Sequence, residues 1–180
     1  MTDGTKVYLA CDSAYSDTMI SSASKSPKVF KKDQHIIGYA GNIGLGQNVC
    51  YNFHPDVSNI DDENYMYTSF MPQLREFVCE MTPDFSSKLD AIDDNHTDFI
   101  VGIKGRLFEI STFGFQCSEY SYTAIGSGSQ IAIGYLFSVL SDELIKNECD
   151  YYNETIKAVE AAIYFNPHCQ HPILIIEMEK

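Results

Sequence analysis

The sequence predicts an α+β fold in which antiparallel sheets carry helices on their outer faces. Strand-like runs come in groups separated by pairs of helical segments, rather than alternating strictly with single helices. The length of 180 residues fits one domain, 1–180, that can bury a substantial core. The composition, with 44% hydrophobic and 21% charged residues, is that of an ordinary globular protein.

The first part of the chain is predicted to form strands. Lys6–Cys11 is a short apolar run typical of a strand buried on both faces, and Asp12 ends it. Lys28–Lys31 and His35–Ala40 are two further strands, joined by the polar turn Lys32–Gln34.

Two helices are expected next. Asn42–Phe53 is predicted to be helical, with Ile43, Gln47 and Cys50 on one side. Glu63–Met81 is predicted to be an amphipathic helix, because apolar residues recur at steps of three and four. Its apolar stripe consists of Met66, Phe70, Leu74, Phe77, Val78 and Met81. Pro72 lies within this stretch and either kinks the helix or starts a new one.

After a polar connection at residues 82–97, Asp98–Lys104 and Arg106–Thr112 are predicted to form a hairpin that turns at Lys104-Gly105. Phe113–Tyr122 is predicted to be irregular. Tyr122–Ile125 is predicted to be a further strand, ended by Gly126.

Two more helices and a strand complete the chain. Ser127 and Ser129 stand where a helix N-cap would be, before a helix at Ile131–Leu140. Asn153–Phe165 is predicted to be helical, with Asn153 as cap, and to end at Asn166-Pro167, since the residue before proline is driven out of helical geometry. Pro172–Met178 is apolar enough to be a central strand.

Charge and composition exclude several classes of function. The net charge of −13 argues against a nucleic-acid or anionic-membrane partner, which requires a basic surface. The chain contains neither a signal-peptide pattern nor an apolar run long enough to span a membrane, so we expect a cytoplasmic protein. We expect no cofactor.

The cysteines are scattered and form no Cys-x-x-Cys pair, so neither a zinc knuckle nor a disulfide framework is indicated. Most are expected to be small buried hydrophobic residues. They are Cys11, Cys50, Cys79, Cys117, Cys149 and Cys169.

Asp12 and Lys28 are the first candidate functional pair. Asp12 ends one predicted strand and Lys28 opens another, sixteen residues later. Groups at adjacent strand ends can meet in one site, and a partly buried lysine near other charges readily changes its pKa. On the pattern alone, most Asp–Lys pairs at this spacing are unrelated surface residues.

The segments ACDSAYSD, KVFKK and HIIGYAG, with AIGSGSQIAIGYL (Ala124–Leu136) and NPHCQHPILIIEM (Asn166–Met178), carry a family resemblance. Together they resemble the proteasome β-subunit and HslV family of N-terminal-nucleophile (Ntn) hydrolases. The resemblance covers nearly the whole chain in the family's order. It implies a four-layer αββα sandwich, in which two stacked sheets are covered by helices on both outer faces.

The resemblance also implies a catalytic apparatus. The family's nucleophile is the side chain of the first residue, usually threonine, whose own α-amino group takes up the proton. Carried over, the orienting aspartate is Asp12, the lysine is Lys28 and the turn serine is Ser127. The supporting Asp–Ser pair falls on Asn166 and Cys169, and so departs from the family pattern.

A larger departure concerns the start of the sequence. Only Met1 and Thr2 precede Asp3-Gly4, which resembles the family's first turn. The first strand and its nucleophile are therefore expected to be missing. Thr2 would lie about six residues, or roughly 20 Å of strand, from the family position.

Three functions follow as hypotheses. The favoured one is a degenerate, non-catalytic pseudoenzyme that acts as an assembly or binding scaffold. The alternative is a threonine-type peptidase, a subunit of a self-compartmentalising protease. The third is a metal-binding module that uses His168, Cys169 and His171. Because Lys6–Cys11 would lose a strand partner, we expect a homo-oligomer or a protein partner that covers this edge.

Overall fold

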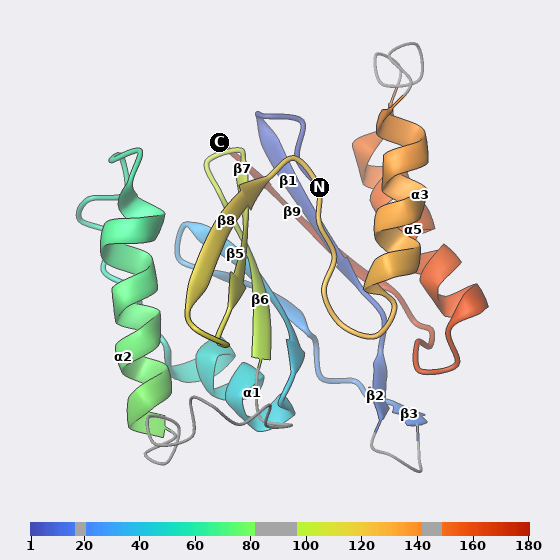
Figure 1. Cartoon of the computed structure of the whole chain (residues 1–180), viewed down its shortest axis with the longest axis horizontal. Coiled ribbons are helices and arrows are strands. Elements are labelled where there is room, and N and C mark those ends of the chain that lie inside the picture. Colours follow the sequence, from blue (N-terminus) through green and yellow to red (C-terminus); the bar gives the residue numbers. More distant parts are fainter. Residues whose placement is uncertain (17–20, 82–96, 142–148) are drawn as a thin grey trace.

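The computed structural model describes residues 1–16, 21–81, 97–141 and 149–180. Its elements form four layers in the order helix, sheet, sheet and helix (Figure 1). The α+β, αββα sandwich expected from the resemblance is therefore confirmed. Most of the predicted connection at residues 82–97 lies outside the described residues.

One inner layer is a five-stranded antiparallel sheet. Its strands, in spatial order, are β4 (Val29–Lys32), β5 (His35–Gly41), β6 (Thr97–Ile103), β7 (Arg106–Ser111) and β8 (Gln116–Tyr120). Strands β4 and β5 agree with the prediction within one residue. The predicted β6–β7 hairpin is also confirmed, and it turns at Lys104 and Gly105, whose φ values of 49° and 75° suit a tight turn.

Strand β8 corrects the prediction that Phe113–Tyr122 is irregular. It is one of the two outer strands of the sheet, opposite β4, and Cys117 is its only residue that is not exposed. Because one side of an outer strand has no neighbour and its side chains here face solvent, no apolar run marks it in the sequence. The segment Tyr122–Ile125, which was predicted to be a strand, forms no regular strand.

The second sheet pairs β1 (Lys6–Cys11) with β9 (Leu174–Glu179) in antiparallel register, from Lys6 opposite Glu179 to Cys11 opposite Leu174. The prediction for β1 is correct. The prediction that the last strand is central is wrong: in the described chain β9 pairs with β1 alone, and Leu174 is 40% exposed. Strands β2 (Ala14–Ser16) and β3 (Ser21–Ala23) pair antiparallel in a separate two-stranded sheet.

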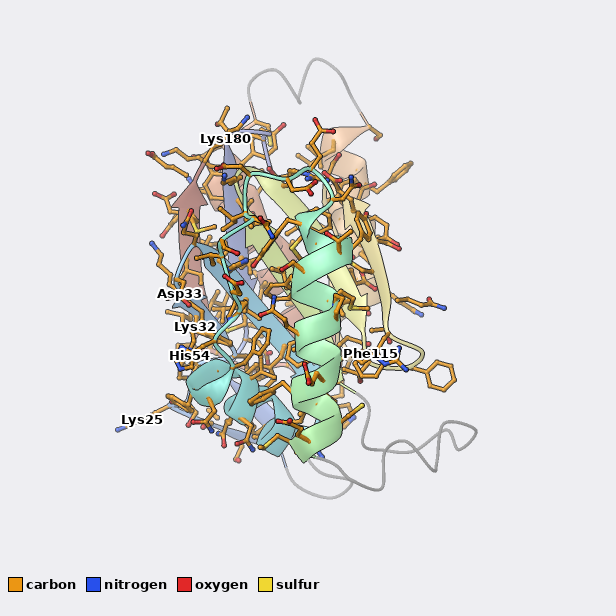
Figure 2. All side chains as sticks on the ribbon, turned by 90° about the vertical axis from the view of Figure 1, so that its left-hand side faces the viewer. Lys25, Lys32, Asp33, His54, Phe115 and Lys180 are labelled. Atoms are coloured by element: carbon orange, nitrogen blue, oxygen red, sulfur yellow. The ribbon has the colours of Figure 1, made fainter. Side chains whose placement is uncertain are left out.

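Helical segments cover the outer face of the five-stranded sheet. They are α1 (Ile43–Asn52), the π-helical turn η1 (Met66–Phe70) and α2 (Met71–Met81). Figure 2 looks onto α2 and shows Lys32 beside His54, where the Lys32 Nζ also lies 3.3 Å from the Tyr51 carbonyl oxygen. A cation here satisfies carbonyl groups at the end of α1.

The segments η1 and α2 confirm the predicted helix Glu63–Met81 from Met66 onward.

The buried face of α1 differs from the prediction. Leu45, Gly46 and Val49 are buried, whereas Ile43 is 38% exposed. Gly46 lies directly on the ring of Tyr39, and a Cβ atom at this position would approach Tyr39 Cδ2 to 2.1 Å. This close contact, which only glycine allows, orients the helix.

The apolar stripe of the next helix is largely correct. Met66, Phe70, Leu74 and Val78 are buried and Phe77 packs against the same core. Met81, at the end of α2, is 47% exposed and was wrongly included.

Helices α3 (Ser129–Leu140) and α5 (Tyr151–Phe165) cover the β1 side. Neither predicted cap is correct. Gly128 takes the N-cap position of α3 without a side-chain hydrogen bond, and the Asp150 carboxylate, rather than Asn153, caps α5 by accepting from the Asn153 N–H. Helix α5 ends before Asn166, as predicted.

Two apolar layers hold the sandwich together. Between the sheets pack Val7, Leu9, Val29, Ile36 and Leu107. Gly102 allows this close approach, since a Cβ atom there would lie 2.6 Å from Val7 Cγ1. Between the five-stranded sheet and its helices pack Phe30, Ile37, Tyr39, Leu45, Val49, Phe70, Leu74, Val78, Phe99, Val101, Phe108 and Ile110.

All six cysteines fall within the described ranges, and they are unpaired and partly buried, rather than mostly buried as predicted. No helix in the described ranges has both the length and the apolar character that crossing a membrane requires.

Candidate functional site

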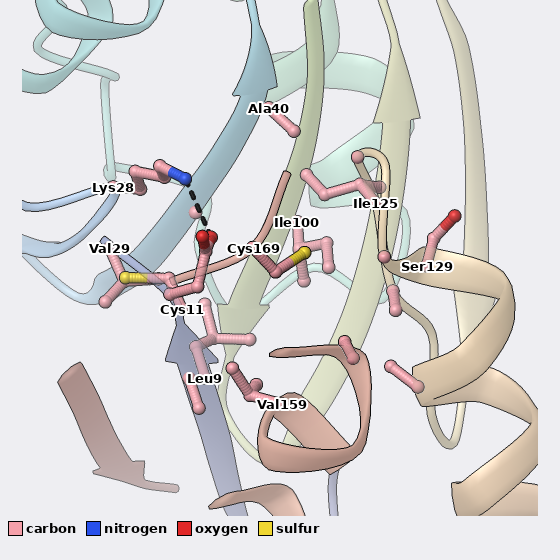
Figure 3. Close-up of a pocket in the computed structure, with 18 of the residues that line it drawn as sticks. Leu9, Cys11, Lys28, Val29, Ala40, Ile100, Ile125, Ser129, Val159 and Cys169 are labelled. Atoms are coloured by element: carbon pink, nitrogen blue, oxygen red, sulfur yellow. Dashed lines mark hydrogen bonds and ion pairs between the residues drawn. The ribbon is translucent and has the colours of Figure 1, made fainter. Parts of the chain in front are cut away.

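Asp12 and Lys28 meet at one end of the sandwich. Asp12 directly follows β1 and Lys28 directly precedes β4, and the Lys28 Nζ donates to Asp12 Oδ1 at 2.7 Å (Figure 3). Their side chains are only 15% and 18% exposed, with Asp12 the more buried. The prediction that these two residues form a pair is therefore confirmed.

The second oxygen of Asp12 holds two other segments. Asp12 Oδ2 accepts from the Ala14 N–H at 2.9 Å and from the Gln170 N–H at 3.1 Å. The carboxylate therefore joins the start of β4, the β2 strand and the turn before β9. These bonds to the backbone hold the carboxylate, and hence the Lys28 ammonium, in a defined position.

Ser127, Asn166 and Cys169 form a second cluster. Ser127 Oγ lies 3.9 Å from Cys169 Sγ, and the Asn166 side-chain amide donates to the Ser127 carbonyl at 2.6 Å. Ser127 therefore contacts Cys169 instead of capping α3. Burial raises the pKa of the Cys169 thiol, and the pKa of the Cys11 thiol is also raised, chiefly by burial. A raised pKa disfavours the thiolate that a cysteine nucleophile needs.

A cavity of about 690 Å³ connects the two clusters. Asp12, Lys28, Ser127 and Cys169 line one end of it, and Met1 lines it as well. Figure 3 shows apolar side chains converging on it from several elements, among them Leu9, Ile100, Ile125 and Val159. Of the predicted site residues, Asn166 is absent from the cavity wall, but it bonds two residues of that wall: its side chain donates to the Ser127 carbonyl, and its carbonyl accepts from the Cys169 N–H at 3.1 Å.

The sequence reasoning missed two carboxylates in the cavity wall, Asp98 and Glu109. Thr123 Oγ1 donates to the Glu109 carboxylate. Along β6 and β7, these two acids alternate with buried apolar residues. Because successive side chains of a strand point to opposite faces, this alternation could have placed both acids inside the sandwich.

Thr2 lies away from this site. Its hydroxyl is 2.8 Å from the Lys6 carbonyl oxygen and 2.5 Å from that of Gly105, and it forms a β-bridge with Val7. Val7 stands five positions before Asp12, which is about 17 Å along a strand. The expected separation between Thr2 and Lys28 is thus present.

The metal hypothesis has no geometric support. His168, Cys169 and His171 lie within the described residues, where no three His, Cys, Asp or Glu side chains come close enough to share a metal ion.

Comparison with solved structures identifies the fold. Neither a protein-family model nor a curated protein sequence matches this chain. Among solved structures, BPH of Thiobacillus denitrificans in complex with epoxomicin superimposes with a TM-score of 0.72 over 99% of this chain and 95% of its own, at 14% identity. The fold is that of the HslV- and proteasome-like Ntn hydrolases.

Two further Ntn structures agree. Eukaryotic HslV from Trypanosoma brucei matches with a TM-score of 0.67 and 18% identity, covering 99% of this chain and 96% of its own. Anbu, the ancestral β-subunit, from Yersinia bercovieri matches with a TM-score of 0.65 and 17% identity, covering 97% and 78%. At these identities the comparisons establish the Ntn fold of this chain and leave its chemistry to the site itself.

Proposed function

We propose that residues 1–180 form one domain of the proteasome- and HslV-like Ntn fold that is non-catalytic by itself and acts as a cytoplasmic assembly or binding scaffold. The position of Thr2 carries this proposal. Its hydroxyl is engaged with two backbone carbonyl groups, about 17 Å of strand from the Asp12–Lys28 pair. A nucleophile must lie within hydrogen-bond reach of the group that activates it, and Thr2 does not.

A threonine-type peptidase is the second candidate, because the Asp12–Lys28 pair is intact and lines a cavity. In that function Lys28 would lower the proton affinity of a nucleophile and Asp12 would orient Lys28. Ser127, Asn166 and Cys169 would support the nucleophile's amine. Asn166 carries no charge for this purpose, and Cys169 is a weak hydrogen-bonding partner.

Turnover of a fluorogenic peptide amide separates the two candidates. We expect no hydrolysis above background by the chain, by its Lys28→Ala variant or by Lys31→Ala, a control for the neighbouring exposed lysine of β4. Hydrolysis that disappears in Lys28→Ala and persists in Lys31→Ala would overturn the non-catalytic proposal. Thr2→Ala would then test the nearest N-terminal hydroxyl as nucleophile.

A further inference from the structure

We propose that the outer face of helix α3 is a contact surface on which a second copy of this chain packs, antiparallel and about a two-fold axis. The inference rests on the proposed scaffold function and deepens it by naming the partner and the surface. The exposed residues of α3 are absent from the cavity wall. Figure 1 shows α3 and α5 as the outermost layer on the β1 side of the sandwich.

Helix α3 has one buried and one exposed face, and neither carries a charge. Ala132 and Leu136 are buried in a cluster with Ala158 of α5. The exposed residues of α3 and its C-cap recur at steps of three and four, as one face of a helix requires. They are Gln130, Ile133, Gly134, Phe137, Ser138 and Ser141. A neutral and partly apolar stripe therefore runs along the outside of the helix.

The other outer helices carry charges on their exposed faces. The exposed face of α2 includes Arg75 and Glu80. That of α5 includes Lys157 and Glu160. This is the usual pattern, because the solvent side of a surface helix is normally polar and charged. From Ser121 to Ser141, in contrast, no charged residue occurs, although the chain has a net charge of −13.

The neutral character of this face favours a second copy of the chain as its partner. Two molecules of net charge −13 repel each other, and the repulsion is weakest where both present a surface without charge. A basic partner would instead be attracted to the acidic surfaces. A two-fold contact places the same patch of both copies together, so this face can meet itself without burying an unpaired charge.

Gly134 and Phe137 give the face a shape that complements itself. A Cβ atom at Gly134 would find no heavy atom of the described chain within 4 Å beyond the backbone of its own helix, whereas at Gly46 and Gly102 it would collide with neighbours. Glycine destabilises a helix interior relative to alanine, and no contact in the described chain requires it at this position. Phe137 lies one turn further along the same face and is 60% exposed. Each copy therefore offers a hollow beside a protruding ring.

An antiparallel pair of α3 helices uses both features at once. A two-fold axis midway between Gly134 and Phe137 places Phe137 of each copy over Gly134 of the partner subunit, with Ile133 opposite the partner's Ser138. The two positions are about 4.5 Å apart along the helix, so the two rings pass side by side. Because one helix pair buries less than the roughly 1,200 Å² of a stable interface, we expect a dissociation constant of about 100 μM.

Sedimentation equilibrium tests the contact from 10 μM to 1 mM protein, at about 0.15 M salt. The parent should dimerise, and Phe137→Glu should weaken the association at least about tenfold, because it places two carboxylates beside the axis. Tyr51→Glu makes the same change at an exposed aromatic residue of α1, in the opposite helical layer, and should leave the association unchanged. A parent that stays monomeric at 1 mM, or an association that Phe137→Glu leaves intact, overturns the proposal.

Mixing two complementary variants tests whether Phe137 faces its own copy. Phe137→Glu and Phe137→Lys should each associate weakly, because each brings like charges together across the axis. Their equimolar mixture should associate at least about tenfold more tightly than either variant alone, since a carboxylate then meets an ammonium group. A folding defect is not repaired by mixing. A mixture that associates no more tightly than the separate variants overturns the two-fold arrangement.

Gly134→Leu fills the hollow and tests it separately. Leucine is a strong helix former and the space above Gly134 is open, so urea unfolding of the dilute monomer should show a folding equilibrium constant about fivefold higher. The association should nevertheless weaken at least about tenfold, because the partner's Phe137 can no longer enter. Undiminished association of Gly134→Leu overturns the packing of Phe137 over Gly134. If Phe137→Glu fails to fold, Gly134→Leu decides alone.

The peptide-amide assay, run on the same samples, separates this inference from the proposed function. A dimer that depends on Phe137 and hydrolyses no peptide supports both. A dimer that depends on Phe137 and also hydrolyses the peptide leaves the interface standing and overturns the non-catalytic role. An inactive protein that stays monomeric at 1 mM overturns the interface alone.

Discussion

Replacing Asp12 by alanine should destabilise the protein strongly, because one carboxylate holds three segments together. The change leaves the Lys28 ammonium, only 18% exposed, without its partner, and it removes the acceptor for the N–H groups of Ala14 and Gln170. Breaking a buried ion pair costs about 3–5 kcal/mol. The residual exposure lets water compensate in part, so we expect a loss of about 3 kcal/mol. For a chain of this size that corresponds to a melting temperature about 6–12 °C lower.

Urea unfolding measures this loss and its origin. Asp12→Asn keeps one acceptor oxygen for the backbone and should lose about half as much free energy. A double-mutant cycle between Asp12→Asn and Lys28→Met should give a coupling of about 1–3 kcal/mol. The same cycle with Lys31→Met, on the exposed face of β4, should give none. An Asp12→Ala variant within about 0.5 kcal/mol of the parent would refute the view that this carboxylate joins the three segments.

Three further predictions concern the core and the assembly. His35 is fully buried, neither ring nitrogen has a hydrogen-bond partner in the described chain, and burial lowers its pKa from 6.5 to about 4. The unfolded chain therefore takes up the proton first, and stability falls by about 3 kcal/mol as pH drops from 6.5 to 4. Urea unfolding of His35→Phe should lack this fall, and an unchanged pH dependence would contradict the assignment. Gly102→Ala should cost about 1–3 kcal/mol by overpacking against Val7, measured in the same way, and a neutral effect would show that the sheets can separate. Light scattering should give a mass above 20.3 kDa that rises with salt, which screens the net charge of −13; a monomer at all salt and protein concentrations would mean that the edge of β1 is capped within the chain.

The elements that the sequence predicted well are those with strong local signals. After Lys6, strand β1 is apolar through Cys11 because both of its faces are covered, and Lys104-Gly105 adopts the positive φ angles of a tight turn. The outer strand Gln116–Tyr120 was missed, because its exposed side chains carry no apolar pattern. Local periodicity thus detects a strand through its burial rather than through its pairing.

The candidate site likewise has one part that the sequence predicted and another that it did not. The spacing of Asp12 and Lys28, together with the family resemblance, was sufficient to predict their contact at 2.7 Å. The contact of Ser127 with Cys169 and the bond from Thr123 to Glu109 join segments far apart in the sequence. No local pattern predicts such contacts, because they depend on how the sheets and helices stack.

The sequence by itself determined most strands and helices and placed Asp12 and Lys28 at neighbouring strand ends, because side-chain periodicity, turn chemistry and strand ends are local properties. Only the tertiary structure decided which strands pair and which segments line the cavity. Strand pairing requires a partner from elsewhere in the chain, and Tyr122–Ile125, although extended and rich in β-forming residues, lies across the cavity from β1. The cavity between them is lined by residues of both sheets and of helices α3 and α5, which meet only when these layers stack.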